Sequence, residues 1–428
     1  YFRKAECREG GGDDYHGDSG HLYVTRGRED GPLARAFIDA ARQAGYPYTS
    51  DLNGYQQEGF GPMDRTTRKG IRHSTSVGYL RSARGRSNLH VLTRAQAHRL
   101  LLDGQRVAGV EFLRHGQSIH ALAEREVILC SGPINSPKLL MLSGIGPGEH
   151  LREAGITPKH DLPGVGQNLQ DHLEIYIQME CLKPVSLYRY YNLLGKAFVG
   201  AQWLFSRTGI GASNQFEVGG FIRSRAGVRH PDLQYHFFPM AVRYDGQSPN
   251  DAHGFQAHVG SMRSQSKGWV KLRAEDPHAA PRILFNYMAH SEDWEEFRSA
   301  VRLTREIFAQ DAFAPLRGRE LAPGPGVVSD AEIDAYLTDA VESAYHPSGT
   351  CKMGSDELSV VDAECQVHGL DGLRVVDSSI IPSIVSGNLN APTIMLAEKA
   401  ADIIAGNNPL EPADVDVYRA ADYRDSQR

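Results

Sequence analysis

The segment AYHPSGTCKMG, residues 344–354, holds a histidine at a position where it could act on a bound ligand. Pro347 restricts the preceding residue to an extended backbone, so His346 follows the end of a helical pattern at a defined point. Histidine is the side chain best suited to accept a proton near neutral pH. The sequence therefore offers His346 as a candidate general base. The alternative is that a single histidine here only supports the structure.

Asn390 is the second candidate, and it lies at the entrance of a long apolar helix. The run RVVD favours a short buried strand that ends at Asp377, and the polar loop SGNLN leads into a helix with Pro392 in its first turn. An asparagine at a helix entrance commonly caps the helix. A side-chain amide beside a histidine can also hold a hydroxyl or alkoxide during hydride transfer. The residues alone leave both interpretations open.

Two glycine-containing clusters could bring backbone N–H groups to an anion. In SGPINSPKLLMLSGIGP, residues 131–147, a strand runs into Gly132 and then into a helix, which can face a phosphate but is also an ordinary strand–turn–helix unit. In DLPGVGQNLQDH, residues 161–172, two glycines and three amides precede Asp171 and His172. Neither cluster is a GxGxxG that follows a strand, so the chain carries no dinucleotide fingerprint.

A mixture of helices and strands must position these candidates. Helical periodicity is found at 32–44, 136–143, 192–206, 291–309, 330–343 and 391–405. Strand-like runs are found at 89–93, 98–104, 106–113, 125–132, 174–179, 233–238, 255–261 and 269–273. DGQR, at 103–106, is a hairpin signal. The pattern predicts a mixed α/β (α+β) fold whose segments interleave between domains.

Composition excludes several classes of protein. The chain has 428 residues, and 46 basic against 52 acidic residues give a formal charge of −6, so a nucleic-acid partner is not expected. The five cysteines are widely spaced and form no CxxC pair, which favours free thiols in a reducing compartment. No apolar run approaches 18 residues, and no GxSxG elbow or HExxH pair is present. A membrane span, a serine hydrolase and metal catalysis are therefore not predicted.

Four motifs resemble, in order and spacing, the glucose–methanol–choline (GMC) family of flavin-dependent alcohol oxidoreductases. They are SGPINSPKLLMLSGIGP, GVGQNLQDH, YHPSGTCKMG and RVVDSSIIPS followed by GNLNAPTIMLAEKAADII. The resemblance covers nearly the whole chain and is greatest to the choline-oxidising dehydrogenases of the family. It implies an FAD-binding region over 1–173, a mainly substrate-binding domain with an antiparallel sheet over 174–343, and a return to the FAD domain over 344–408. The tail over 409–428 is polar and charged, and it is expected to fray.

The resemblance also implies an N-terminal truncation. Family members begin with a βαβ unit that carries GxGxxG, and no such unit is found in this sequence. Tyr1 is therefore interpreted as a cut within a longer protein, which would lack the segment that helps to hold its cofactor.

Roles follow from the resemblance residue by residue. His346 matches the catalytic histidine, and Asn390 matches the second catalytic position. Glu217 matches a carboxylate that faces the trimethylammonium group in choline-oxidising members, although members that use uncharged alcohols keep one there too. Tyr345 and Phe216 are candidate aromatic neighbours of that cation. The residues matched to flavin contacts are Val91 in a strand after Asn88, Asp377, Ser378, Asn390, Ala391, Pro392 and Thr393.

The implied activity is FAD-dependent oxidation of a primary alcohol, in which His346 removes the hydroxyl proton and hydride passes to flavin N5. Choline is the expected substrate, converted to betaine aldehyde and on to glycine betaine, with a quinone or an artificial compound as electron acceptor. The expected location is intracellular, either cytoplasmic or peripherally membrane-associated (the mitochondrial inner membrane in a eukaryote). The alternatives are a family member for another aliphatic or polyol-type alcohol, and a truncated inactive chain that cannot hold FAD.

Overall fold

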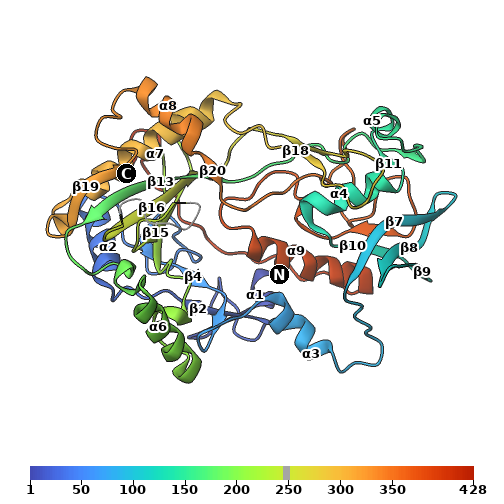
Figure 1. The fold of residues 1–428 in the computed structure, drawn as a ribbon, viewed down its shortest axis with the longest axis horizontal. Helices are drawn as coiled ribbons and strands as arrows, with labels where there is room; N and C mark the ends of the chain where they lie inside the picture. The colour runs from blue at the N-terminus through green and yellow to red at the C-terminus, as the bar shows by residue number, and fades with distance from the viewer. Residues whose placement is uncertain (244–250) are drawn as a thin grey trace.

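The fold is built around two hydrophobic cores, which lie in the left and right halves of Figure 1. It is taken from a computed structural model that describes residues 1–243 and 251–428. The larger core lies against a seven-stranded sheet, and the smaller one lies among α4, α9 and two short parallel strands.

The central sheet is antiparallel at each of its pairings, in the order β19-β13-β16-β15-β14-β3, with β20 beside β13. Its strands are β3 (Gly59–Pro62), β13 (Leu173–Cys181), β14 (Val218–Ile222), β15 (Leu233–Phe238), β16 (Gly254–Ser261), β19 (Arg317–Ala322) and β20 (Glu342–Ser343). The predicted mixed fold with an antiparallel sheet is confirmed. The predicted domain limits remain a proposal, and β3, from within the predicted FAD region, joins this sheet.

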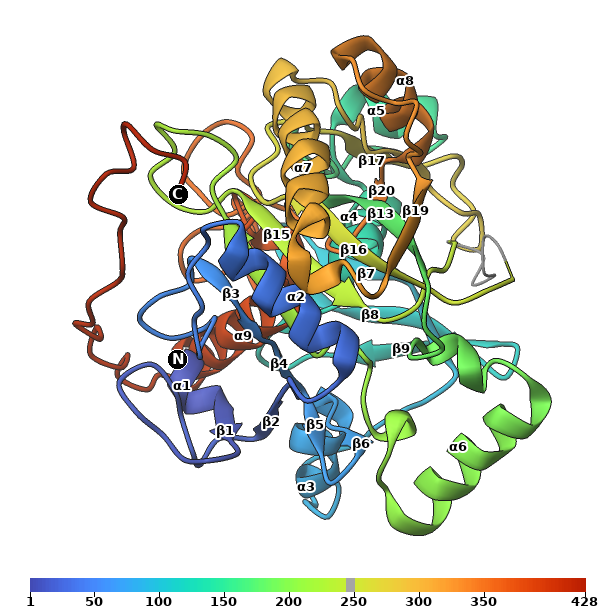
Figure 2. The same cartoon turned by 90° about the vertical axis from the view of Figure 1, so that its left-hand side faces the viewer.

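One face of the sheet is apolar because alternate strand residues point the same way. Ile175, Ile177 and Met179 of β13 enter the larger core, as do Tyr235 and Phe237 of β15. Three helices cover this face: α2 (Pro32–Gln43), α7 (Ser291–Ala309) and α8 (Asp330–Ala340). Figure 2 shows α2 and α7 crossing it side by side. The opposite face carries polar residues on β13, β15 and β16, among them Glu174, His236 and His258, and the candidate site is built on them.

The second core joins segments that are far apart in the chain. In it, β10 (Val127–Leu129) pairs in parallel with β21 (Leu373–Val375), and α4 (Gly132–Leu142) and α9 (Asn390–Ala405) pack nearby. The three-stranded sheet β7 (Ala95–Asp103), β8 (Arg106–Arg114) and β9 (Gln117–Leu122) completes it. The predicted DGQR hairpin is confirmed between β7 and β8, where Gly104 adopts φ +58°.

Shorter elements complete the chain. The helices are α1 (Phe2–Ala5), α3 (Arg81–Ala83), α5 (Gly148–Glu153) and α6 (Leu193–Ser206), with a π-helical turn η1 (Ser76–Leu80) and 3₁₀ turns η2 (Leu187–Tyr190), η3 (Ile210–Ala212), η4 (Asp311–Phe313) and η5 (Ser378–Ile380). The strands are β1 (Glu6–Arg8), β2 (Leu22–Arg26), β4 (Asp64–Arg65), β5 (Thr67–Arg68), β6 (Ile71–Arg72), β11 (Ile145–Gly146), β12 (His160–Asp161), β17 (Trp269–Lys271) and β18 (Arg282–Leu284). Among the described residues, no helix is both long and apolar enough to cross a membrane.

The start of α4 differs from the sequence prediction, and the reason is local. The helix begins at Gly132 rather than Ser136, so Pro137 lies inside it and cannot donate a hydrogen bond to the Pro133 carbonyl. The hydroxyl of Thr350 donates to that carbonyl instead, at 2.6 Å. A contact from 217 residues away therefore satisfies the acceptor that the proline leaves open.

Two other predictions about the backbone are wrong. Residues 89–93 form no strand, because no described strand lies beside them to pair with, and Val91 is exposed. The tail after Pro409 does not fray but lies along the sheet domain, at the left of Figure 2. The Arg223 guanidinium donates to the Ser426 carbonyl at 2.8 Å, and the Gly227 N–H donates to the Tyr423 carbonyl at 2.7 Å.

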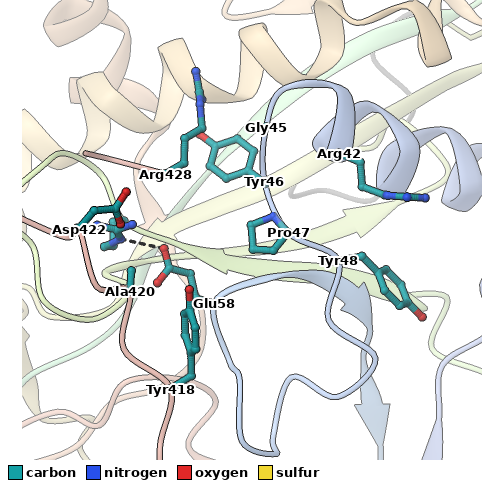
Figure 3. Close-up of a pocket in the computed structure, with 11 residues that line it drawn as sticks. Arg42, Gly45, Tyr46, Pro47, Tyr48, Glu58, Tyr418, Ala420, Asp422 and Arg428 are labelled. Carbon is teal, nitrogen blue, oxygen red and sulfur yellow. Dashed lines mark hydrogen bonds and ion pairs between the residues drawn. The ribbon is translucent and has the colours of Figure 1, made fainter. Parts of the chain in front are cut away.

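A pocket opens where this tail meets the sheet domain (Figure 3). The Arg428 guanidinium donates to the Tyr46 hydroxyl at 2.9 Å, and buried Arg223 pairs with Glu58 at 2.7 Å. The residues that line it are Arg42, Gly45, Tyr46, Pro47, Tyr48, Glu58, Arg223, Tyr418, Ala420, Asp422 and Arg428. None of the candidate catalytic residues is among them, so this pocket is separate from the site described next.

Candidate active site

The polar face of the central sheet forms the floor of the candidate site. Glu174 and Tyr176 of β13, His236 of β15 and His258 of β16 alternate with the residues that enter the core. The strand register places His258 directly opposite both Tyr176 and His236. Three neighbouring strands therefore bring two imidazoles, a carboxylate and a phenol to one patch of the sheet.

His346 lies in the loop after β20 and is fixed through its backbone. Its N–H donates to Asp171 Oδ1 at 2.9 Å. Asp171 is buried, and its other oxygen accepts hydrogen bonds from the hydroxyls of Ser343 at 2.6 Å and Tyr287 at 2.7 Å. Because this carboxylate ties three segments together, the position of the His346 backbone does not depend on the imidazole itself. Tyr345, predicted as a neighbour of the substrate, is 76% exposed.

The contacts of His172, a second histidine in a loop, determine which nitrogen of His346 can accept a proton. His346 Nδ1 lies 3.0 Å from His172 Nδ1, while His172 Nε2 lies 2.8 Å from the Val385 carbonyl and 3.2 Å from the Met262 carbonyl. Carbonyls only accept, so His172 carries its proton on Nε2 and accepts at Nδ1. His346 then donates from Nδ1, which leaves its Nε2 unprotonated.

Asn388, rather than Asn390, lies beside that nitrogen. The Asn388 Nδ2 atom is 3.4 Å from His346 Nε2 and 3.5 Å from His236 Nε2, and its Oδ1 accepts from Gln234 Nε2 at 2.9 Å. The sequence predicts Asn390 as the partner of His346, and among the described residues no hydrogen bond joins the two. Asn390 is the first residue of α9, with an exposed side chain that forms no hydrogen bond among the described residues. Leu389 occupies the cap position, so Asn390 does not cap the helix either.

Burial and neighbouring charge keep the two paired histidines neutral. Burial, together with the imidazoles of His172 and His236 and against the opposing pull of Glu174, lowers the pKa of His346 to about 3. Burial likewise lowers the pKa of His172 to about 4. At neutral pH both rings are uncharged. A neutral His346 with an unprotonated Nε2 can act as a proton acceptor.

Glu174 is the carboxylate of this site. Its Oε1 lies 3.0 Å from His258 Nδ1, and its side chain is 12% exposed. Burial alone would raise its pKa, but the hydrogen bond and charge of His258, with His236 and His346, hold the pKa below the ordinary value. Phe216, predicted as an aromatic neighbour of the substrate, lies close by, with its ring 5.1 Å from that of His258. The site thus combines an ionised carboxylate with aromatic faces.

Glu217, which the resemblance matches to a carboxylate facing the substrate cation, is bonded to other residues of the chain. Its Oε2 accepts from the Arg65 guanidinium and, at 2.6 Å, from the Arg28 N–H, while the Ser213 hydroxyl donates to Oε1. The ion pair with Arg65 compensates its charge. The sequence neighbour Phe216 faces the site, with its ring 5.1 Å from that of His258, whereas the hydrogen-bond partners of Glu217 are Arg65, Arg28 and Ser213.

The predicted flavin-contact residues fall into two groups. Asp377 is buried, accepting at Oδ2 from the Gly132 N–H at 2.9 Å and the Ser136 hydroxyl at 2.6 Å, so it fastens the start of α4 to the end of β21. The Ser378 carbonyl accepts from the Gly349 N–H at 3.1 Å. Four others form the first turn of α9, namely Asn390, Ala391, Pro392 and Thr393. Val91 belongs to neither group and is 47% exposed in an irregular segment.

The residues present fit a large cofactor with a polar chain. The first N–H groups of α9 have no partner within the helix, and at Gly132 (φ +81°) the space a side chain would enter is open. Apolar Ile128, in strand β10 ahead of α4, is 40% exposed. The buried Ser348 hydroxyl, two residues from His346, has no partner among the described residues. Donors, open space and apolar surface are thus present at the starts of α4 and α9 and on β10.

Comparison with known proteins identifies the family. Residues 1–174 and 264–397 match the N- and C-terminal parts of GMC oxidoreductase. The chain is 57% identical over 422 residues to an "oxygen-dependent choline dehydrogenase" of Chromohalobacter salexigens, which covers 98% of this chain and 76% of the relative. The chain belongs to the GMC oxidoreductase family.

Other GMC relatives agree with this assignment. Proteins of the same name from Stenotrophomonas maltophilia and Klebsiella pneumoniae are 56% and 55% identical, covering 98% and 99% of this chain and 76% and 77% of the relatives. Among solved structures, a pyridoxine 4-oxidase from Mesorbium loti matches with a TM-score of 0.84 at 32% identity, over 95% of this chain and 76% of that one. A formate oxidase of Aspergillus oryzae matches with a TM-score of 0.87 at 25% identity, over 95% and 77%.

Proposed function

We propose that this chain oxidises choline to betaine aldehyde, with FAD as the hydride acceptor and His346 as the base. Two observations support the proposal. Relatives named choline dehydrogenase are 55–57% identical over nearly the whole chain. The observation that carries the chemistry is the unprotonated Nε2 of a neutral His346, which faces the Asn388 amide across 3.4 Å. The structural relative from Aspergillus oryzae is described as carrying FAD.

His346 and Asn388 together can hold and deprotonate an alcohol. A substrate hydroxyl that displaces the contact between Asn388 and His346 donates its proton to His346 Nε2, while the Asn388 Nδ2 group donates a hydrogen bond to the oxygen as negative charge develops there. His172 accepts the hydrogen bond from His346 Nδ1 and keeps the reacting nitrogen aimed at the substrate. FAD, when bound, supplies the two-electron acceptor for the hydride that leaves the carbinol carbon. The hydrated aldehyde presents the same group again, which allows a second oxidation to glycine betaine.

The cation of choline has a matching place on the sheet. Glu174, ionised and only 12% exposed, lies beside the ring of His258, and Phe216 completes an aromatic wall. A quaternary ammonium group is bound well by a carboxylate together with aromatic faces. We therefore assign the cation to Glu174 and not to Glu217.

The residues proposed to hold FAD are those of the two helix starts. The first turn of α9 offers the backbone N–H groups of Asn390 and Ala391, whereas Pro392 has none and the Thr393 N–H donates to the Leu389 carbonyl. The turn at Gly132, whose N–H donates to Asp377, leaves open space, and the Ser378 carbonyl accepts from the Gly349 N–H. Val91 is a proposed neighbour of the adenine. For the electron acceptor, the names of the relatives specify oxygen, so oxygen is to be tested first and a quinone second.

Anaerobic reduction tests the proposed function directly. The chain is loaded with FAD, binding is measured by quenching of flavin fluorescence, and choline is then added without oxygen. We expect the absorption band of oxidised flavin to bleach with choline and to bleach far less with 3,3-dimethylbutan-1-ol, the uncharged isostere. If FAD does not bind, the chain is inactive by itself. If the uncharged alcohol reduces the flavin better, the substrate is another alcohol.

Asn388 and Asn390 form a matched pair of variants. Asn388→Ala is expected to lower kcat for choline by about 10²-fold, because a donor to the developing oxyanion is lost. Asn390→Ala removes a side chain that forms no hydrogen bond among the described residues and keeps the backbone N–H proposed for FAD, so it should lower kcat far less. Steady-state kinetics of both FAD-loaded variants makes the comparison. A larger loss for Asn390→Ala would return the catalytic role to the residue favoured by the sequence pattern.

A further inference from the structure

A row of buried polar side chains leads along the sheet to the carboxylate of Glu174. Gln256 and His258 of β16 are two residues apart, so their side chains share one face of the sheet. Gln178 of β13 lies directly opposite Gln256 in the strand register. All three are buried. Because buried polar groups satisfy one another by hydrogen bonds, their contacts determine where each proton lies.

The orientation of the Gln256 amide follows from a backbone contact. The Val242 N–H lies 2.8 Å from Gln256 Oε1, and a backbone N–H only donates, so this atom is the amide oxygen. The Gln178 amide donates to the same oxygen at 2.8 Å and to the Val242 carbonyl at 2.7 Å. The amide nitrogen of Gln256 is therefore the atom that lies 2.7 Å from His258 Nε2.

This contact determines the protonation of His258. An amide nitrogen only donates, so His258 Nε2 accepts and the ring proton lies on Nδ1, from which it is donated to Glu174 Oε1 at 3.0 Å. A second ring proton, on Nε2, would face the donor group of Gln256. At neutral pH the ring thus gives Glu174 a hydrogen bond without a neutralising charge. In acid, where Glu174 titrates, a second proton adds the charge that helps to lower the pKa of this carboxyl.

His16 shows how a buried imidazole behaves when both of its nitrogens face carboxylates. Its Nδ1 lies 2.9 Å from Glu6, and its Nε2 lies 2.9 Å from Asp51. Burial lowers the pKa of His16, but the hydrogen bonds and charges of Asp51 and Glu6 outweigh burial and raise that pKa to about 10. The His16 ring is therefore a cation that neutralises its partners. The amide of Gln256 is the feature that keeps His258 from the same state.

We propose that Gln256 and His258 are positioning residues that orient Glu174 toward the substrate cation without neutralising its charge. The inference rests on the proposed function, because it takes Glu174 as the carboxylate that binds the quaternary ammonium group. A carboxylate already held in one direction loses less conformational freedom when the cation binds. Neither positioning residue belongs to the pair that holds the alcohol, His346 and Asn388, so KM rather than kcat should depend on them.

Replacement of His258 tests the proposal by kinetics of the FAD-loaded chain. His258→Phe keeps a ring of similar size but removes the donor, so we expect the KM for choline to rise about 10- to 100-fold through the lost hydrogen bond to a charged group. His258→Asn places an amide N–H near the position of Nδ1 and should restore most of that loss. The KM for 3,3-dimethylbutan-1-ol and the kcat for both alcohols should change far less.

The matched control is His253→Phe, the same substitution one residue before β16 begins. Its Nδ1 contacts the Ser186 hydroxyl at 2.7 Å and not Glu174, so the ratio of the two KM values should stay that of the parent. An unchanged KM for choline in His258→Phe overturns the proposal. So does an equal rise for choline and its uncharged isostere, because a general loss of packing would affect both alcohols.

The pH profile separates this role from a structural one. Burial raises the pKa of Glu174 and the hydrogen bond of His258 lowers it, so that pKa should be higher in His258→Phe. The KM for choline should then fall in this variant as the pH rises through the neutral range and the carboxyl ionises, and it should stay flat in the parent. The variant leaves in place the other groups around this pair, namely His236 of β15, His346 of the loop after β20, and Tyr176, whose ring packs on His258.

Nitrogen NMR of the histidine rings tests the protonation state without any substrate. The signals of His258 are identified as those missing from His258→Asn. At neutral pH we expect the parent ring to be protonated at Nδ1 and not at Nε2, and in Gln256→Glu we expect it to be protonated at both, as in His16. A parent ring protonated at Nε2 overturns the proposal.

Calorimetric binding of tetramethylammonium separates this proposal from the proposed reaction. The cation should bind the FAD-loaded parent and bind His258→Phe more weakly. If it does so while choline fails to reduce the flavin, the proposed reaction is wrong and the roles of Gln256 and His258 are supported. If it binds both chains equally, or neither, the positioning role is wrong whatever the reaction.

Discussion

Replacing His346 with alanine is expected to lower kcat for choline by about 10²–10⁴-fold while FAD still binds. The reason is the position of one proton: the contacts of His172 with two carbonyls leave His346 Nε2 as the unprotonated nitrogen at the site. The backbone of His346 is held by Asp171, so the loop should keep its conformation without the imidazole. Rapid-mixing measurement of flavin reduction by choline gives the rate of the chemical step.

The control for His346→Ala is His120→Ala, an exposed histidine of β9. Circular dichroism and FAD affinity should be unchanged in both variants, and only His346→Ala should slow flavin reduction. A variant at His346 that retains near-normal turnover would remove the base from the proposed reaction. A loss of FAD binding would instead show that the ring supports the cofactor pocket.

Much of the fold could be predicted because a strongly periodic hydrophobic pattern indicates which side of a helix or strand is buried. Helix α7 covers 291–309 and strand β15 covers 233–238, both as the hydrophobic pattern indicates. Strand β14, with the sequence VGGFI, lacks alternation because it is buried on both sides, and the pattern gave no sign of it. The run at 89–93 has the composition of a strand but no described neighbour, and a strand exists only when paired.

The site was harder to predict because it depends on which strands are neighbours. Glu174, His236 and His258 each alternate with core residues, so the sequence could indicate a polar face on each strand. The pairing and register of the strands bring these three faces together, and no local sequence pattern shows which strands pair. The choice between Asn388 and Asn390 depends on the conformation of one loop. Glu217 forms an ion pair with Arg65, which is 152 residues away, so a local motif cannot predict that its charge is compensated.

The second prediction with a large expected effect concerns Glu174 and the KM for choline. Glu174→Gln is expected to raise the KM for choline by about 10²-fold or more, because a buried quaternary ammonium would lose its only charged partner in the proposed site. The uncharged isostere 3,3-dimethylbutan-1-ol has no such charge to match, so its KM should change little. Initial rates of the FAD-loaded variant with both alcohols measure the ratio. The variant keeps the shape of the side chain, which limits any effect on packing.

Glu217→Gln is the matched control, and it should produce a different kind of loss. Removing its charge leaves the Arg65 guanidinium, which is only 11% exposed, without its ion-pair partner, so the midpoint of thermal unfolding should fall. The ratio of KM values for choline and its uncharged isostere should stay that of the parent. A change of this ratio in Glu217→Gln but not in Glu174→Gln would place the cation at the residue favoured by the sequence. Because stability and selectivity are measured separately, a merely destabilised variant cannot imitate the loss of a cation site.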